Sequence, residues 1–331
     1  MGIMRCQKVS ARGGAIYRVQ ADAGDQVKPP KETYIVESPN ALSFQLRLWI
    51  CGAPLRARVV RAGIDLFGAA QQMGLLPQYP KDLFEVCITT GGLTYQLPVA
   101  FYEGMGGTLQ RSLISCRRFR KEGKGWNARV ESYLNFEAFE EIDEGRDKTI
   151  VIGDTIATGG TLATVIPFLI RWFKERGEGL ERILVLSHAA SLNGLNRLRE
   201  VGEETGISLA VATSNVIAHL RDDGTALRWE DPGYPKGWAG GEAIVPEPIS
   251  SQVNKFFGCE WLKGEINLCG DWGKRGNAPL GHLNEALLHY EYIMTKARRE
   301  GPEEACIKVG EMIDATQQMI DLFSKPLSYT E

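Results

Sequence analysis

The sequence predicts an α/β protein with a mostly parallel sheet flanked by helices and a helical extension at the C-terminus. Three observations predict this fold. Short apolar runs typical of buried strands alternate with amphipathic helical segments through the middle of the chain. The polar and glycine-rich loops of the chain follow these predicted strands. Parallel sheets bind ligands at the carboxyl ends of their strands, so these loops are placed to form a binding site. Beyond residue 241 the alternation stops, and long helical segments follow.

Composition narrows the class of protein. The 331 residues suffice for one large domain or two modest ones, and the net charge of -3 gives no overall positive field to attract nucleic acid or an anionic membrane. No apolar run approaches the roughly 20 residues that span a bilayer. Seven scattered cysteines do not resemble a disulfide framework, and the N-terminus has no apolar secretory core. We therefore expect a cytoplasmic protein without a nucleic-acid or membrane partner.

The elements follow in order along the chain. Residues 1–36 are polar and include the breaker KPPKE, so we expect an N-terminal segment apart from the main domain, 37–245. Helical spacing of apolar residues begins at residue 41 and covers about 55–76. The run LFEVCI then reads as a buried strand that ends in the turn TTGG.

Strands and helices continue in alternation after that turn. RSLISC is a predicted strand that leads into a basic, glycine-dotted loop. KTIVI is the next strand, followed by the loop GDTIATGGT and an amphipathic helix that ends near Gly177. The runs RILVLS and SLAVATS complete the predicted parallel strands, with a helix between them.

The last part of the chain, 246–331, is predicted to be a helical extension. AIVPEPISS is proline-rich, as a linker would be. Two helices of about 279–298 and 302–323 follow, and we expect an antiparallel pair packed on the α/β domain.

The loop GDTIATGGT has the composition of an anion site. A helix N-terminus after a strand points free N–H groups at a ligand, glycines let the backbone approach it, and threonine hydroxyls donate further hydrogen bonds. No lysine follows the last glycine, and the G-x-G-x-x-G spacing is absent, which excludes nucleoside-triphosphate and dinucleotide loops. The alternative is an ordinary helix cap with glycines in a tight turn.

TIVIGDTIATGGT resembles the phosphoribosyl-pyrophosphate (PRPP) signature of type I phosphoribosyltransferases, which is an apolar strand, an acidic position and then T-x-A-T-G-G-[TS]. Among these enzymes the chain is most similar to uracil phosphoribosyltransferases over about residues 37–240. The segments SPNALSFQLRL, ISCRRFRKEGKG and YLNFEAFEEIDEGRDKTIVI carry that similarity. The resemblance implies the phosphoribosyltransferase fold and a homo-oligomer.

The resemblance also implies roles for the loop residues. Asp154 matches the acid that holds the ribose hydroxyls, where a carboxylate also favours positive charge on the ring. Position 153, where uracil enzymes carry aspartate, is glycine here. We expect a side chain at Gly159 to fill the phosphate cradle. The residues implied to bind the 5-phosphate are Thr155, Ala157, Thr158, Gly159, Gly160 and Thr161.

Two further segments match the pyrophosphate side of the site. Thr90 and Gly91 lie in the turn that matches the family's pyrophosphate loop, although an ordinary turn is the alternative. Arg118 matches the family's arginine, whose guanidinium suits pyrophosphate oxygens, and a solvated charged face is its alternative. Mg²⁺ carried mainly by the substrate is the expected cofactor, and we predict no metal site built by the protein itself.

The acceptor region departs from the uracil enzymes. Their uracil-binding motif is replaced by GTALRWEDPGYPKGWAGGEA, so we expect a planar acceptor other than uracil. Rings can stack on such an acceptor and a carboxylate can take a hydrogen bond from it, whereas core packing is the alternative for the aromatic residues. The candidates are Trp229, Asp231, Gly233 and Tyr234. His188 follows a buried strand, and a structural role is the expected one.

These observations predict an enzyme that transfers 5-phosphoribosyl from PRPP to a nitrogen or carbon atom of a planar acceptor and releases pyrophosphate. Two alternatives stay open. One is a diverged uracil phosphoribosyltransferase of pyrimidine salvage. The other is a non-catalytic regulator that senses PRPP or a nucleotide, which Gly153 and the altered TTGG turn favour.

Overall fold

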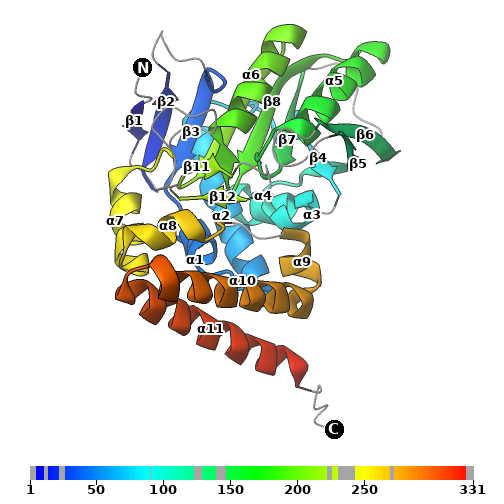
Figure 1. Cartoon of the computed structure of the whole chain (residues 1–331). Coiled ribbons are helices and arrows are strands. Elements are labelled where there is room, and N and C mark those ends of the chain that lie inside the picture. The colour runs from blue at the N-terminus through cyan, green and yellow to red at the C-terminus, as the bar shows by residue number, and fades with distance from the viewer. Residues whose placement is uncertain are drawn as a thin grey trace.

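A twisted nine-stranded sheet forms the centre of the protein in the computed structural model (Figure 1). The structure describes residues 5–10, 14–21, 27–89, 91–122, 129–138, 147–221, 226–229, 243–268 and 272–325. In β5 and β6 it describes the side chains of only part of each strand. The strand order is β1-β2-β3-β10-β8-β7-β4-β5-β6.

The central part of the sheet is parallel and both edges are antiparallel. Parallel pairing joins β3 to β10, β10 to β8, β8 to β7, β7 to β4 and β4 to β5, while β1–β2, β2–β3 and β5–β6 are antiparallel. This arrangement confirms the predicted fold class. The strands are β1 (Arg5–Ser10), β2 (Ile16–Gln20), β3 (Glu32–Val36), β4 (Leu83–Ile88), β5 (Gln110–Glu122), β6 (Arg129–Ala138), β7 (Lys148–Gly153), β8 (Leu180–Ser187) and β10 (Ser208–Ser214).

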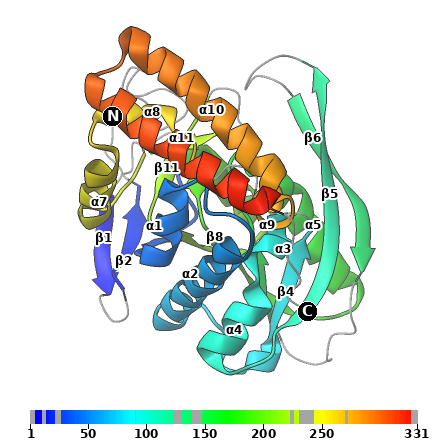
Figure 2. The same ribbon diagram turned by 90° about the horizontal axis from the view of Figure 1, so that it is seen from below.

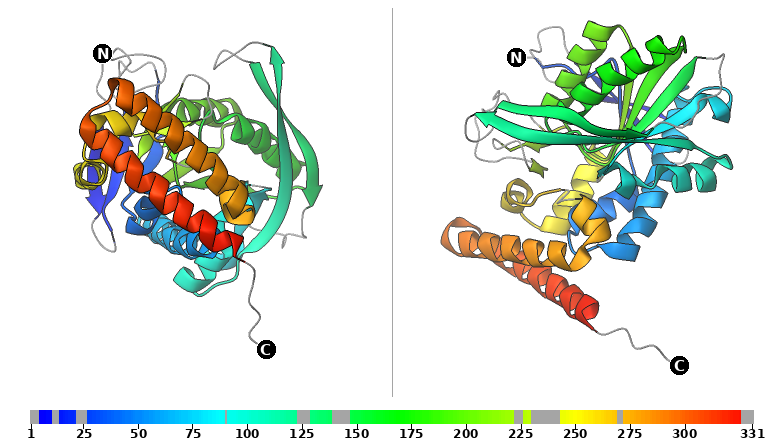
Figure 3. Two further views of the ribbon diagram at one scale, coloured as in Figure 1. Left: turned by 60° about the horizontal axis from the view of Figure 1, so that its bottom comes forward. Right: turned by 90° about the vertical axis from the view of Figure 1, so that its right-hand side faces the viewer.

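Helices cover both faces of the sheet, which explains why its central strands are apolar throughout. Every residue of β4 and β7 is buried. One face packs on α5 (Gly160–Glu175) and α6 (Leu192–Thr205), and the other packs on α2 (Gly52–Gln72) and α4 (Leu97–Met105). The right-hand view of Figure 3 shows α5 and α6 on one side of the sheet and α4 on the other.

Residues 16–20 and 32–36 are strands of this sheet, which corrects the expectation that residues 1–36 stand apart from it. Ile16, Tyr34 and Ile35 are buried in the core. Each of the two strands is only five residues long and is flanked by polar segments, so the average over the segment is polar. The domain boundary at 245/246 stays a prediction.

The C-terminal helices lie against the end of the sheet where the parallel strands terminate. They are α7 (Glu247–Phe257), α8 (Glu260–Glu265), α9 (Trp272–Asn277), α10 (Pro279–Glu300) and α11 (Glu303–Ser324). The predicted pair is confirmed by α10 and α11, which run side by side in Figures 1 and 2. The predicted linker is wrong in its second half, because α7 begins at Glu247.

Buried polar contacts join this extension to α1 (Pro39–Leu46). Arg275 is fully buried, and its Nη2 donates to the carbonyls of Phe44, Arg47 and Ile50 at 3.1, 3.1 and 2.9 Å. The guanidinium therefore satisfies carbonyls at and beyond the end of α1, which have no partner within the helix.

Among the described residues, no helix has both the length and the apolar character to cross a membrane.

Candidate functional site at the carboxyl ends of the parallel strands

The loop between β7 and α5 is held in place by backbone pairing with a neighbouring segment. Ile156 N donates to Ala189 O at 3.0 Å, and Ser191 N donates to Ile156 O at 2.7 Å. The Ser191 hydroxyl donates to Ala157 O and also accepts from Gly194 N at the start of α6. The loop that carries the signature is thus fixed to the first turn of α6.

Gly159 takes part in this packing. Its φ of +71° favours glycine, and a Cβ added there would lie 2.7 Å from Gly194 O. The expectation that a side chain would fill the cradle is thereby revised, because the added atom meets α6. Thr158, in contrast, is exposed, and its Oγ1 accepts from Gly160 N at 3.5 Å.

The N-terminus of α5 is the candidate anion-binding element of the site. The first N–H groups of a helix have no intrahelical partner, and the helix dipole favours negative charge there. The helix begins at Gly160, directly after the loop, and Thr161 lies in its first turn, half-buried. This arrangement suits a phosphate group.

Asp154 lies where two loops meet. Its Oδ1 accepts from Thr155 N at 2.9 Å, which orients the carboxylate at the end of β7. A Cβ added to Gly91, in the turn after β4, would lie 3.7 Å from the same Oδ1. The structure therefore brings the candidate acid and the candidate pyrophosphate turn together, as expected for the carboxyl ends of neighbouring parallel strands.

Tyr95, in the short helix α3 (Gly91–Tyr95), connects this loop to the end of β8. Its hydroxyl lies 3.1 Å from Thr155 Oγ1 and accepts from His188 N at 3.2 Å. Because the hydroxyl already accepts from the amide, its own proton is available to Thr155. The ring stacks on the imidazole of His188, with 4.5 Å between centroids and 6° between planes.

His188 is fully buried, and burial lowers its pKa to about 3. Its Nδ1 lies 3.4 Å from Ser214 Oγ, and its carbonyl accepts from Gln45 Nε2. The imidazole is therefore neutral at physiological pH and packs between Tyr95 and Phe44, whose ring meets it edge-on at 5.2 Å. These contacts support the structural role expected for this histidine.

Other predicted residues are distributed as follows. Arg118 lies in β5 opposite Ser132 of β6, in a long ribbon at the sheet edge (Figure 2). Trp229 is 1% exposed and belongs to the core under the C-terminal helices, which is the packing role left open for it.

The remaining predicted residues, Thr90, Asp231, Gly233 and Tyr234, lie outside the described residues. Within the described ranges, no group of three or more His, Cys, Asp or Glu side chains can hold a metal ion.

Sequence reasoning missed Tyr95 and the buried polar group around His188. The Tyr95–Thr155 and Tyr95–His188 contacts join residues 60 and 93 positions apart, so no local spacing reveals them. Asn215 was also missed. Its φ is +66°, and its hydrogen bonds to Ser38 and Gln45 connect the end of β10 to both ends of α1.

Comparisons with known proteins give a distant likeness. No protein-family model matches the chain, and no curated protein matches its sequence. Among solved structures, the chain is similar to the L. donovani hypoxanthine-guanine phosphoribosyl transferase, with 12% sequence identity and a TM-score of 0.27. The match covers 50% of this chain and 82% of that chain. This likeness is too distant to assign a substrate or a site residue to the chain.

Proposed function

We propose that this protein is a phosphoribosyltransferase that transfers 5-phosphoribosyl from PRPP to a planar acceptor other than uracil and releases pyrophosphate. One observation carries the proposal. The segment TIATGGT, which resembles the PRPP signature, leaves the carboxyl end of a central parallel strand and ends at the N-terminus of a sixteen-residue helix. That placement suits a bound 5-phosphate.

Each residue of the candidate site has a separate proposed role. The first amides of α5 and the exposed Thr158 hydroxyl would hold the 5-phosphate. Asp154 would accept hydrogen bonds from the ribose hydroxyls and stabilise the positive charge that develops on the ring as pyrophosphate departs. Gly91 lies beside Asp154 and would let its backbone approach the pyrophosphate. Arg118 would add positive charge to the pyrophosphate side.

Mg²⁺ would enter with the substrate. Pyrophosphate oxygens would supply most of its ligands, and Asp154 is the carboxylate that the loop offers. Such an ion neutralises charge on the leaving group. The protein side chains would then act by positioning and electrostatics.

No described cysteine of the strand ends is suited to act as a nucleophile. Cys87, near the end of β4, is buried, and burial together with the nearby Glu85 carboxylate raises the pKa of its thiol to about 12. The thiol stays protonated at neutral pH, and a thiol is a weak nucleophile. Cys87 is therefore not assigned a role as nucleophile in the proposed transfer.

One observation favours a second candidate, a regulator that binds PRPP or a nucleotide without catalysis. Position 153 is glycine where uracil enzymes carry aspartate, and the Tyr95 ring occupies the space beside it. Loss of that acid is compatible with binding and unfavourable for turnover. A diverged uracil enzyme is the third candidate.

The test is pyrophosphate release from PRPP and Mg²⁺ by the purified protein. The reactions contain no acceptor, uracil, or members of a panel of planar heterocycles and aromatic amines. Release that depends on a panel member and not on uracil supports the proposal. Release with uracil would support the salvage enzyme, and saturable PRPP binding without release would support the regulator. Absence of both binding and release would contradict all three.

Asp154→Asn provides the matched variant. The amide oxygen of asparagine can still accept from Thr155 N, so we expect the fold to be retained. We expect kcat/KM to fall roughly hundredfold or more. Asp147→Asn, at the opposite end of β7 and exposed, is the control with unchanged activity. Equal activity of the two variants would remove Asp154 from its assigned role.

A further inference from the structure

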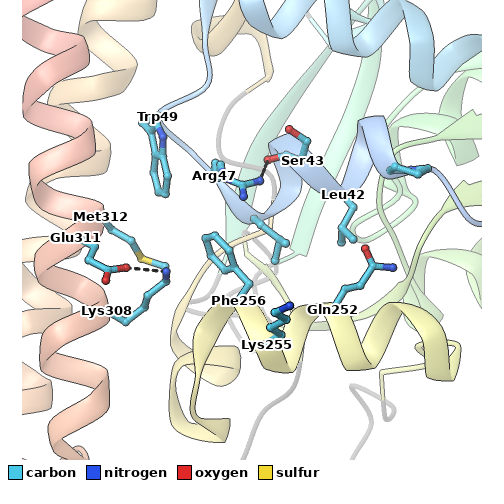
Figure 4. Close-up of a pocket in the computed structure, with 12 residues that line it drawn as sticks. Leu42, Ser43, Arg47, Trp49, Gln252, Lys255, Phe256, Lys308, Glu311 and Met312 are labelled. Atoms are coloured by element: carbon cyan, nitrogen blue, oxygen red, sulfur yellow. Dashed lines mark hydrogen bonds and ion pairs between the residues drawn. The ribbon is translucent and has the colours of Figure 1, made fainter.

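A cavity of about 660 Å³ lies between α1, α7 and α11 (Figure 4). Its volume falls within the range of small-molecule sites, roughly 300–1,000 Å³. Helix α1 separates it from the candidate active site. Phe44 and Gln45 of α1 contact His188, whereas Leu42, Ser43 and Leu46 line the cavity. The cavity is therefore a separate site.

The lining carries an excess of positive charge. Arg47, Lys255 and Lys308 line the cavity together with a single carboxylate, Glu311. That carboxylate is used by Lys308, whose Nζ lies 2.8 Å from its Oε2. Arg47 and Lys255 form no ion pair within the described residues. A ligand with a negative charge would therefore meet two cations that form no ion pair with a carboxylate of the described residues.

Arg47 is held in place and partly removed from water. Its Nη1 donates to Ser43 O at 3.4 Å, and its guanidinium lies over the Phe256 ring, 5.0 Å from the centroid. Burial, and secondarily the charge of Arg58, lower the pKa of Arg47. A positive group in this environment gains more from an anion than a fully solvated one does.

The rest of the lining is apolar and aromatic. Leu42 and Leu46 of α1 and Met312 of α11 are buried, and Trp49 and Phe256 are half-buried. Figure 4 shows the side chains of Trp49, Phe256 and Met312 between α11 and α1, with Lys255 and Gln252 on α7. An apolar body would remove this surface from water, while the cations take its acidic group.

We propose that this cavity binds an organic carboxylate with an apolar body. The carboxylate pairs with Arg47 and Lys255, and the apolar body lies against Trp49 and the leucines of α1. This assignment rests on the charges and contacts of the cavity and is independent of the proposed transferase function.

Calorimetric titration of the full chain with 4-phenylbutyrate, and with its neutral amide, tests the proposal. We expect the acid to bind and the amide to bind roughly tenfold more weakly or not at all, because the two compounds differ in the group that the cations recognise. Equal affinities, or no binding of the acid at millimolar concentration, would overturn the proposal.

Three variants locate the binding. Lys255 is exposed, so Lys255→Met leaves packing intact and should weaken binding of the acid several-fold. Lys174→Met, which removes an exposed lysine of α5, and Thr158→Ala, in the phosphate loop, should leave binding unchanged. A loss of binding in Thr158→Ala with none in Lys255→Met would place the anion at the N-terminus of α5 and contradict the proposal.

Discussion

Gly153, the last residue of β7, lies directly against the side chain of Tyr95. A Cβ added at position 153 would come within 2.8 Å of both Cβ and Cγ of Tyr95. An aspartate at this position, which uracil phosphoribosyltransferases carry, is therefore incompatible with the tyrosine as it is placed. In return, the Tyr95 hydroxyl lies 3.1 Å from Thr155 Oγ1, so the loop gains a polar contact to α3.

This contact predicts that the cost of a side chain at position 153 depends on Tyr95. We expect Gly153→Ala to lower the free energy of unfolding by about 1–3 kcal/mol, because the added methyl overpacks a buried site. In a Tyr95→Gly background, which removes the tyrosine Cβ together with its ring, the same substitution should cost less. Urea denaturation of the wild type, both single variants and the double variant measures the coupling. Equal costs in the two backgrounds would contradict the proposed contact.

Substitutions at the neighbouring residues Gly159 and Thr158 are predicted to have different effects on stability. Gly159→Ala should destabilise the fold by about 1–2 kcal/mol from the left-handed backbone alone, and more from the contact with Gly194 O. Thr158→Ala, at an exposed position, should change stability by less than about 0.5 kcal/mol.

On the proposed function, however, Thr158→Ala should weaken PRPP binding. Thermal denaturation and PRPP titration of both variants distinguish the two effects. A Gly159→Ala protein with wild-type stability, or a Thr158→Ala protein with wild-type PRPP affinity, would contradict the corresponding assignment.

The central strands were predictable because a parallel sheet is buried on both faces. LFEVCI and KTIVI are nearly continuous apolar runs, and the structure makes them β4 and β7. Strands β2 and β3 were not predictable in the same way. Their place in the sheet depends on pairing with a distant partner, since β3 pairs with β10 through Ile35 and Thr213. Such a partner leaves no local signal in a five-residue strand.

Some residues of the candidate site were also predictable from the sequence, and others were not. The loop from Asp154 to Thr161 was predictable because its glycines and threonines are contiguous and follow a strand. Tyr95 and Gln45 were not, because they reach the site from separate helices and their roles arise from tertiary packing. The nearness of Gly91 to Asp154 followed from sheet topology, which places the ends of parallel strands at one edge.

A buried ion pair between adjacent strands gives a third prediction. Glu85 of β4 has no exposed side-chain surface, and Arg111 of β5, its register partner, donates to both carboxylate oxygens at 2.6 and 3.2 Å. Burial raises the pKa of Glu85, and the Arg111 hydrogen bond opposes that shift. Removing the arginine leaves a buried carboxylate without this neutralising partner.

We therefore expect Arg111→Met to lower the free energy of unfolding by about 3–5 kcal/mol. The double variant Glu85→Gln/Arg111→Met should recover part of that loss, because no charge is left buried. Urea denaturation at neutral pH measures both. A cost below about 0.5 kcal/mol for Arg111→Met would show that the pair does not contribute to stability.

The stacked pair of His188 and Tyr95 makes stability depend on pH. The pKa of His188 is about 3 in the folded protein, against an ordinary value of 6.5, because burial disfavours the imidazolium. As the pH falls below about 6.5, His188 is protonated in the unfolded chain and stays neutral in the folded protein. The free energy of unfolding therefore decreases with acidification. Each pH unit in this window costs up to about 1.4 kcal/mol.

His188→Phe keeps a ring against Tyr95 and removes the titrating group. We expect the stability of the wild type relative to this variant to fall by about 1–2 kcal/mol between about pH 7 and pH 5. Chemical denaturation at each pH measures the difference. Titration of the carboxylates and of the other histidines, including the half-buried His289, is common to both proteins. If the free energies of unfolding of the two proteins change in parallel with pH, His188 has the same pKa in the folded and unfolded states. That result would contradict the assignment of a neutral, stacked imidazole.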